Sequence, residues 1–338
     1  MRDFHRYGTL ARQRLRAGAR VGAQVGVGTA RGALRDRIHG LAAEASFWTM
    51  LSMPPLLLAL LALIGQLGDV IGADTAGWVA RSLLGWADGV FTDRTMQEIV
   101  RPLVGDTLRE GHSGLLSLGV VLALWSGSAA VSSYVSAVTT AYDLGGLRSF
   151  WRSRLLSLAM YLAGLVIGAV LLPLIVIGPD ILGRLLAQVS GSDLSWLVSA
   201  AYWPVVVVLS LVALTSLYHL AVPVRTRWRK DFPGAVLALL IWVLSSVGLR
   251  LYLGSGLGGD AGPAAAPIAV LLFFFLTALA VLIGAEFNAT IDDLWPEPST
   301  EEGRRSARQR QATDADVGRS TPRARDSRHA AYARHDAR

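Results

Sequence analysis

Ionisable side chains inside long apolar stretches are the residues of this sequence that could carry chemistry. Glu44 lies near the beginning of one such stretch, and Glu286 lies near the end of another. A charged group at membrane depth costs roughly 2.5–3.5 kcal/mol on insertion scales, so it usually faces a cavity or a partner. The two glutamates could line one vestibule, or each could bind a neighbouring helix or an arginine such as Arg148 or Arg225. We favour the structural role for both.

Polar side chains also occur in the apolar stretch that ends just before Asp143. Trp125 and Ser126 stand in its middle, where small polar groups suit either tight packing or a hydrated groove, and the sequence leaves both open. Tyr142 and Asp143 stand at its end. There we expect Asp143 to form a structural clamp with an arginine, rather than to take part in transport chemistry. The arginines that could complete the clamp are Arg148, Arg152 and Arg154.

Two further features complete the set of candidate residues. Asn288 stands two positions after Glu286 and is a candidate for the same pathway or for a structural contact. A basic cluster lies between two apolar stretches, and its members are Arg225, Arg227, Arg229 and Lys230. Basic residues near a membrane surface attract anionic lipids, so we expect this cluster to contact lipid headgroups.

The residue types for hydrolytic or metal chemistry are missing or scattered. Cysteine is absent from the 338 residues, which excludes disulfides, thiolate metal sites and cysteine nucleophiles. The six histidines form no closely spaced pair, and the acids do not gather as the metal site of a nuclease requires. We therefore assign no catalytic, metal-binding or cofactor-binding residue, and we do not expect an enzyme.

Membrane-spanning helices must position the candidate residues, because the chain is strongly apolar. Hydrophobic residues make up 52% of it, charged residues only 17%, and the mean hydropathy is +0.44. Stretches long enough to cross about 30 Å of hydrocarbon lie near 42–65, 114–136, 155–178, 197–220, 233–253 and 264–289. The sequence thus predicts an all-α integral membrane protein with about six spans. Pro54 and Pro55 predict a kink in the first span.

Basic residues predict the orientation of these spans. Arginine and lysine are dense in the N-terminal arm, in every second loop and in the tail, and sparse in the loops between. Cytoplasmic loops carry an excess of basic residues. The alternation therefore predicts an even number of crossings, with both termini in the cytoplasm.

The chain divides into three parts by composition. Residues 1–40 hold nine arginines against two aspartates and should form a basic cytoplasmic arm, in part an interfacial helix that binds anionic lipid rather than nucleic acid. Residues 41–292 form the membrane domain. Its loop 66–113 should carry amphipathic helices on the outer face, or form a small packed cap. Residues 293–338 have few large apolar groups and should be a disordered cytoplasmic tail.

Several short motifs, in order along residues 35–292, resemble the YihY / virulence factor BrkB family, once named ribonuclease BN. They are Ser52-Met53-Pro54-Pro55-Leu56-Leu57, Leu124-Trp125-Ser126, Ala141-Tyr142-Asp143, Leu217-Tyr218 with Pro223, Pro233-Gly234-Ala235 with Trp242, and Gly284-Ala285-Glu286-Phe287-Asn288. The arm and the tail fall outside the resemblance. It implies a six-span helical protein of the bacterial inner membrane with a transport-like role that involves lipid or envelope components.

Two functions follow as hypotheses. The first is a transporter or flippase-like protein for a lipid, anionic or envelope-related substrate, based on the buried glutamates, the proline-broken first span and the basic cytoplasmic rim. The second is a non-transporting scaffold for envelope proteins. Membrane lipids with anionic headgroups are the expected partners, and a homo-oligomer is compatible with the sequence.

Overall fold

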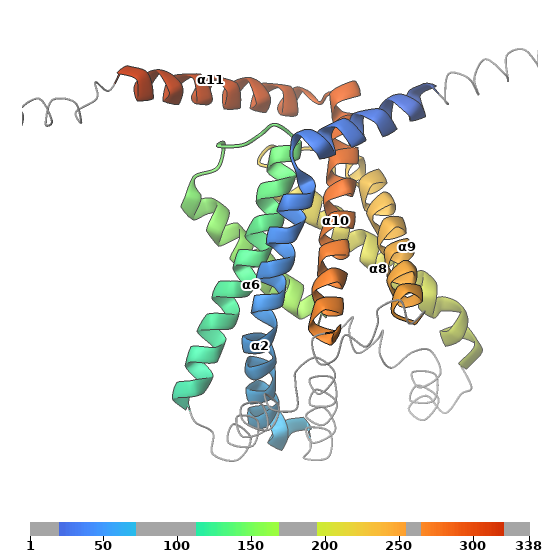
Figure 1. The fold of residues 1–338 in the computed structure, drawn as a ribbon. Helices are drawn as coiled ribbons and strands as arrows, with labels where there is room; N and C mark the ends of the chain where they lie inside the picture. Colours follow the sequence, from blue (N-terminus) through green and yellow to red (C-terminus); the bar gives the residue numbers. More distant parts are fainter. Residues whose placement is uncertain (1–19, 72–112, 169–194, 255–264, 321–338) are drawn as a thin grey trace, which may run out of the picture.

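The computed structural model describes residues 20–71, 113–168, 195–254 and 265–320 (Figure 1). Its helices are 20–35, α2 (Ile38–Ile71), α6 (Ser113–Ala141), Phe150–Gly168, α8 (Ser195–Ala221), η2 (Trp228–Lys230), α9 (Phe232–Gly254), α10 (Ala265–Leu294) and α11 (Pro298–Ser320). These ranges contain no strand, so the predicted all-helical fold is confirmed for them.

Five helical segments are long and apolar enough to cross a bilayer. They are Val120–Ala141, Phe150–Gly168, Ala200–Ala221, Trp228–Leu253 and Pro267–Leu294. They match the last five predicted spans, although the predicted span 155–178 is described only to residue 168. The first predicted span corresponds to α2, which is helical throughout and contains Pro54 and Pro55. The kink and the total of six crossings stay predictions.

The long helices pack as a bundle around α10. Helix α2 packs against α6, and α10 lies against both of them and against α9, while α8 contacts α9 and α6. The helix 20–35 and α11 lie across the same end of this bundle, at the top of Figure 1, and extend from it in opposite directions. We call this the polar end; it also includes the turns 142–149 and 222–231.

Small side chains fill the contacts between the helices. Ala42 of α2, Ala137 of α6 and Ala278 of α10 are almost completely buried in one shared cluster. Side chains of this size let helix backbones approach closely, which is how helices associate when lipid removes the hydrophobic drive between them. Large apolar side chains point outward instead. Trp203 of α8 is 63% exposed and Leu251 of α9 is 68% exposed, as expected of surfaces that face hydrocarbon.

The structure differs from the sequence-based expectation in the C-terminal tail. Residues 293–338 were expected to be disordered, yet Pro298–Ser320 forms α11. Pro298 begins the helix and Glu301 lies in its first turn, both of which suit a helix N-terminus. The side of α11 with Gly303 and Ala307 is buried, and Gly303 approaches Leu144. Hydropathy alone does not detect such a narrow contact.

The N-terminal arm and the outer cap are described only in part. Residues 20–35 are helical, consistent with the predicted interfacial helix. Helix α2 continues to Ile71, beyond the predicted end of the first span at residue 65. The remainder of the predicted cap in 66–113, from residue 72 to residue 112, and the first 19 residues of the arm lie outside the described residues.

Candidate functional site

The helix 20–35 lies directly on the polar end of α10. Glycines make this possible, because a Cβ at Gly28 would collide with the Thr290 side chain and one at Gly32 would collide with the Glu286 carboxylate. Positions 28 and 32 share one face of their helix, and positions 286 and 290 share one face of α10. The N-terminal helix therefore covers Glu286, which is only 2% exposed.

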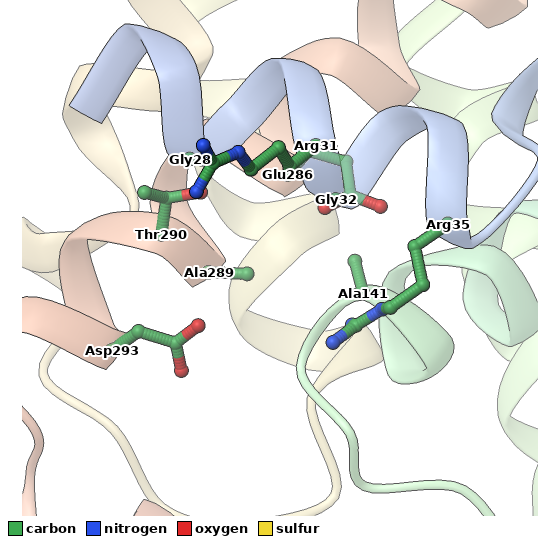
Figure 2. A pocket seen from close by; sticks show the side chains of 9 residues that line it. All are labelled: Gly28, Arg31, Gly32, Arg35, Ala141, Glu286, Ala289, Thr290 and Asp293. Carbon is green, nitrogen blue, oxygen red and sulfur yellow. The ribbon is translucent and has the colours of Figure 1, made fainter. Parts of the chain in front are cut away.

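A cavity of about 260 Å³ opens beside this contact. Its lining residues come from the helix 20–35, from α6 and from α10, and they are Gly28, Arg31, Gly32, Arg35, Ala141, Glu286, Ala289, Thr290 and Asp293 (Figure 2). In this view Arg35 and Asp293 reach toward the cavity from opposite sides. The cavity thus combines two guanidinium groups, two carboxylates and a hydroxyl at one end of the membrane domain.

Most charges around the cavity are paired. The Arg35 guanidinium donates to both carboxylate oxygens of Asp36, at 2.8 and 3.1 Å, and to Asp143 at 3.4 Å. These carboxylates raise the pKa of Arg35 further above its usual value, so it stays charged. On the other side, Asp293 is paired with Arg304 of α11 at 2.8 Å.

Two groups in the cavity lack such a partner. Oε1 of Glu286 is buried and has no hydrogen-bond partner among the described residues. Arg31, which is exposed, forms no ion pair within the described ranges. A buried polar oxygen without a donor costs roughly 1–3 kcal/mol, so a donor on a ligand would be favourable there. Asp36 interacts electrostatically with Glu286 and adds negative charge near this oxygen.

Asn288 has a structural role on the other side of α10. Its Oδ1 accepts the backbone N–H of Gly234 at 2.7 Å, and its Nδ2 donates to the carbonyl of Asp231 at 2.8 Å. Both partners stand at the beginning of α9, where the N–H of Gly234 has no partner within the helix, while the Asp231 carbonyl also accepts the N–H of Ala235 at 3.3 Å. The Asn288 amide therefore fastens the beginning of α9 to α10.

A buried polar cluster surrounds these two hydrogen bonds of Asn288. The Tyr142 hydroxyl donates to Oδ1 of Asp231 at 3.2 Å, and His219 Nδ1 lies 3.4 Å from Oδ2 of the same carboxylate. Burial raises the pKa of Tyr142 well above its usual value, so the hydroxyl stays protonated and remains a donor. Tyr142 thus links the end of α6 to the beginning of α9. Both Tyr142 and Asn288 contribute to packing here, and neither lines the cavity.

The predicted clamp at Asp143 has a different partner. Asp143 adopts a left-handed backbone conformation (φ 56°), and bonds from the N–H of Asp143 to Thr140 O and from Leu144 N–H to Thr139 O close α6. This is a Schellman ending, in which aspartate tolerates the left-handed position. The Asp143 carboxylate then meets Arg35, because that helix crosses the turn.

Arg148 binds backbone rather than a carboxylate. Its guanidinium donates to the carbonyls of Leu220, Ala221 and Val222, each at 3.0 Å. These carbonyls stand at the end of α8, where they lack partners within the helix and where the helix dipole favours a cation. Arg148 therefore terminates α8 and connects it to the turn 142–149.

The other candidate residues lie apart from the cavity. Glu44 is exposed and accepts a hydrogen bond from Ser133 of α6 at 3.2 Å, so the two glutamates do not share the cavity. Trp125 is 65% exposed under the guanidinium of Arg154, which lies 5.0 Å from the ring centre. Ser126 bonds to the carbonyl of Leu122 in its own helix.

Of the four basic residues predicted to contact lipid headgroups, three are exposed and one is engaged within the protein. Arg225, Arg227 and Arg229 are exposed around η2. Lys230 instead lies 3.4 Å from Glu297 and donates to the carbonyl of Trp295 at 3.2 Å. It therefore connects η2 to the segment between α10 and α11. The described residues contain no group of three or more His, Asp or Glu side chains that could hold a metal ion.

Comparison with known proteins agrees with the motifs found in the sequence. The family model for virulence factor BrkB matches residues 29–310. The chain belongs to the BrkB family. It is also 30% identical over 255 residues to the putative ribonuclease-like protein YfkH of Bacillus subtilis (strain 168), across 74% of this chain and 88% of that protein. No solved structure matches the chain.

The BrkB match extends beyond the region in which the sequence resemblance was recognised. It begins at residue 29 rather than 35 and ends at residue 310 rather than 292, so it includes Gly32 of the N-terminal helix and Arg304 of α11. Membership in this family and the five apolar helices identify a multi-pass membrane protein. Part of each element that covers the polar end, residues 29–35 and 298–310, thus lies within the matched region.

Sequence reasoning missed several residues of this BrkB site. Arg31 and Arg304 were counted only as basic residues of the arm and the tail, and Asp231 was not singled out. One usable signal was present, because Gly28 and Gly32 have the four-residue spacing that allows helices to approach closely.

Proposed function

We propose that this BrkB family protein is a transporter of the inner (plasma) membrane, flippase-like in its action, which holds the charged end of a lipid or other anionic, amphiphilic substrate in the Glu286 cavity. Both termini are cytoplasmic in this proposal, so the cavity opens at the cytoplasmic surface. The observation that carries it is the burial of Glu286, with an oxygen that lacks a donor, beside a cavity that also contains Arg31 and Arg35.

The position of Glu286 in α10 supports a role at the membrane surface. The last residue of α10, Leu294, lies eight positions after Glu286, which corresponds to roughly 12 Å along a helix. A charged headgroup could reach this depth from the aqueous side while its apolar part remains among lipid tails. The exposed Arg225, Arg227 and Arg229 would raise the local concentration of anionic substrates at the same end.

The test is lipid movement in reconstituted vesicles. Liposomes with a fluorescent lipid in both leaflets are treated with a membrane-impermeant reductant, and full-length protein should increase the fraction of lipid that is bleached. Substituting Glu286→Gln should slow this movement, whereas Glu44→Gln, outside the cavity, should leave it unchanged. Vesicles that also contain a fluorescent organic anion distinguish a lipid from a soluble substrate.

The outcomes separate the competing functions. If the wild-type protein moves neither lipid nor anion, the transporter proposal is wrong. A stoichiometric partner in pull-downs would then favour the scaffold, which the tight alanine contacts between α2, α6 and α10 also support. The name of the Bacillus subtilis relative suggests a ribonuclease as a third function. RNA cleavage by the purified protein that one substitution abolishes would favour it.

A further inference from the structure

The charges that remain unpaired in the Glu286 cavity indicate which ligand it can accept. Arg35 is engaged by Asp36 and Asp143, and Asp293 is engaged by Arg304. The lining groups left without such partners in the described part of the chain are Arg31 and Oε1 of Glu286. One is a cation and the other is an acceptor on a carboxyl group, so together they complement a ligand with one charge of each sign.

We infer that the cavity binds a small zwitterion that carries a primary ammonium group and a phosphate, with the ammonium donating to Oε1 of Glu286 and the phosphate bound by Arg31. This inference rests on the proposed function and specifies the substrate class of the same site. The chemistry is that of phosphoethanolamine, whether as a soluble molecule or as the headgroup of a lipid.

The acidic end of the cavity selects an ammonium group. Glu286 is only 2% exposed to solvent, and Asp36, itself held by Arg35, lies close enough to interact with it. A purely anionic ligand would add to this negative charge and would leave Oε1 of Glu286 without a donor. A primary ammonium supplies three N–H donors and a positive charge, which a quaternary ammonium cannot match because it has no N–H.

The basic rim of the cavity suits a phosphate. Arg31 and Arg35 are four residues apart and therefore lie on one face of the helix 20–35, and both line the cavity. A phosphate has more oxygens than a carboxylate and can contact both guanidinium groups while Arg35 keeps its aspartate partners. The Thr290 hydroxyl, also in the lining, is a further donor.

The size of the cavity fits a headgroup rather than a whole lipid. Its volume of about 260 Å³ lies just below the roughly 300–1,000 Å³ of sites for drug-sized ligands. The absence of a Cβ at Gly28 and Gly32 keeps the helix 20–35 close above it, so the cavity cannot widen without movement of that helix. The acyl chains of a lipid ligand would stay outside it.

Equilibrium binding to the full-length protein in detergent tests this inference without requiring transport. The probes are short-chain phosphatidylethanolamine, phosphatidylcholine and phosphatidylglycerol, together with soluble phosphoethanolamine and inorganic phosphate. Phosphatidylethanolamine should bind about tenfold more tightly than the other two lipids, the factor expected for one charge-assisted hydrogen bond. Tight binding of soluble phosphoethanolamine would identify a soluble ligand, and binding of the lipid alone would identify a lipid headgroup.

Variants assign the two ends of the ligand. Glu286→Gln should remove the preference for phosphatidylethanolamine over phosphatidylcholine, and Arg31→Gln should weaken the binding of every phosphate probe. Matched controls on α11 are Glu301→Gln and Arg308→Gln, which change the same charges at exposed positions away from the cavity. Thermal unfolding in the same detergent identifies any variant that fails to fold. If a variant does not fold, the order of affinities of the wild-type protein for the probes tests the inference alone.

Two results would overturn the inference. Equal affinity for phosphatidylethanolamine and phosphatidylcholine would mean that no N–H donor is recognised. Affinity for phosphatidylglycerol or inorganic phosphate that matches the zwitterions would mean that the site binds anions only. Zwitterion binding without any flux would keep this inference and refute the transporter, whereas flux of lipid without headgroup preference would do the reverse.

Discussion

Gly32 and Glu286 touch so closely that no side chain fits between the N-terminal helix and α10. The contact joins residues that are 254 positions apart in the chain, and it closes the Glu286 cavity on the side of the arm. Because Gly32 carries no Cβ, the Glu286 carboxylate can remain buried without any movement of the helix 20–35.

Substituting Gly32→Ala should therefore displace the N-terminal helix. The added methyl group collides with the Glu286 carboxylate, and overpacking of this kind costs about 1–3 kcal/mol. We expect a lower thermal unfolding temperature and faster trypsin cleavage at the arginines of this helix. The matched control is Gly26→Ala, because a Cβ at Gly26 meets nothing within 4 Å. There the higher helix propensity of alanine should stabilise the helix by up to about 1 kcal/mol. Equal effects of the two substitutions would contradict the close packing at Gly32.

Substituting Asn288→Leu should loosen α9 from α10. It leaves the Gly234 N–H buried without a partner, which costs about 1–3 kcal/mol, and the Asp231 carbonyl keeps only the N–H of Ala235 at 3.3 Å. Hydrogen exchange followed by mass spectrometry should then show faster exchange in the first turn of α9. In the control Ser210→Ala, the lost hydroxyl bonds only to Val206 within its own helix, so exchange in α9 should be unchanged.

Substituting Arg148→Lys should destabilise the end of α8 although the charge is kept. A lysine ammonium has no planar fork and cannot reach three carbonyls with the geometry of the guanidinium. We expect a loss of about 1–2 kcal/mol, in the range measured for a helix cap, read as a lower unfolding temperature in detergent. Arg152→Lys, at an exposed position of the next helix, is the control. An unchanged transition for both variants would refute the capping role.

Substituting Arg304→Gln should release α11 from the polar end. Arg304 is paired with Asp292 at 3.2 Å and with Asp293 at 2.8 Å, and it donates to the carbonyl of Tyr142 at 3.0 Å. Without this arginine, trypsin should cleave α11 several times faster at its remaining basic residues. Substitution of the exposed Arg308 should have no such effect on cleavage elsewhere in α11, and protection that persists in Arg304→Gln would show that other contacts hold the helix.

Single cysteines should test the proposed orientation, since the natural chain has none. In intact cells a membrane-impermeant maleimide should label Ser255→Cys, which lies in a loop predicted to be outside. It should not label Gly22→Cys or Ser306→Cys, at exposed positions of the two helices on the polar end, until the membrane is permeabilised. Labelling of the latter pair in intact cells would place the polar end outside.

The sequence was sufficient for the features that depend on local hydropathy. The apolar stretches predicted the helices. The sequence also predicted that Glu286 would need a cavity or a partner, because the free-energy cost of a charged group depends on its depth within its own helix. The motif around Asn288 was recognised by its resemblance to the family, which also depends on a short local stretch of sequence.

The contacts that build the site depend instead on the three-dimensional arrangement. Arg148 was expected to pair with an acid, but the carbonyls at the end of α8 are a better partner once α8 ends beside it. Asp143 meets Arg35 because a left-handed residue turns the chain under the N-terminal helix. The tail contains too few apolar residues to predict α11, since polar contacts of Ser299, Arg304 and Arg310 and the close approach of Gly303 hold it in place. None of these contacts leaves a periodic pattern in the sequence.

The two bonds from the Asn288 amide to the main chain of α9 have a mechanical consequence. Rotation of a side chain on α9 cannot release them, because both partners are backbone atoms. Near the polar end, α9 and α10 therefore behave as one rigid body. Helix α8, by contrast, buries few of the residues of its apolar part, Ala200–Ala221. Any hinge in the bundle thus lies outside the polar end of this α9–α10 pair.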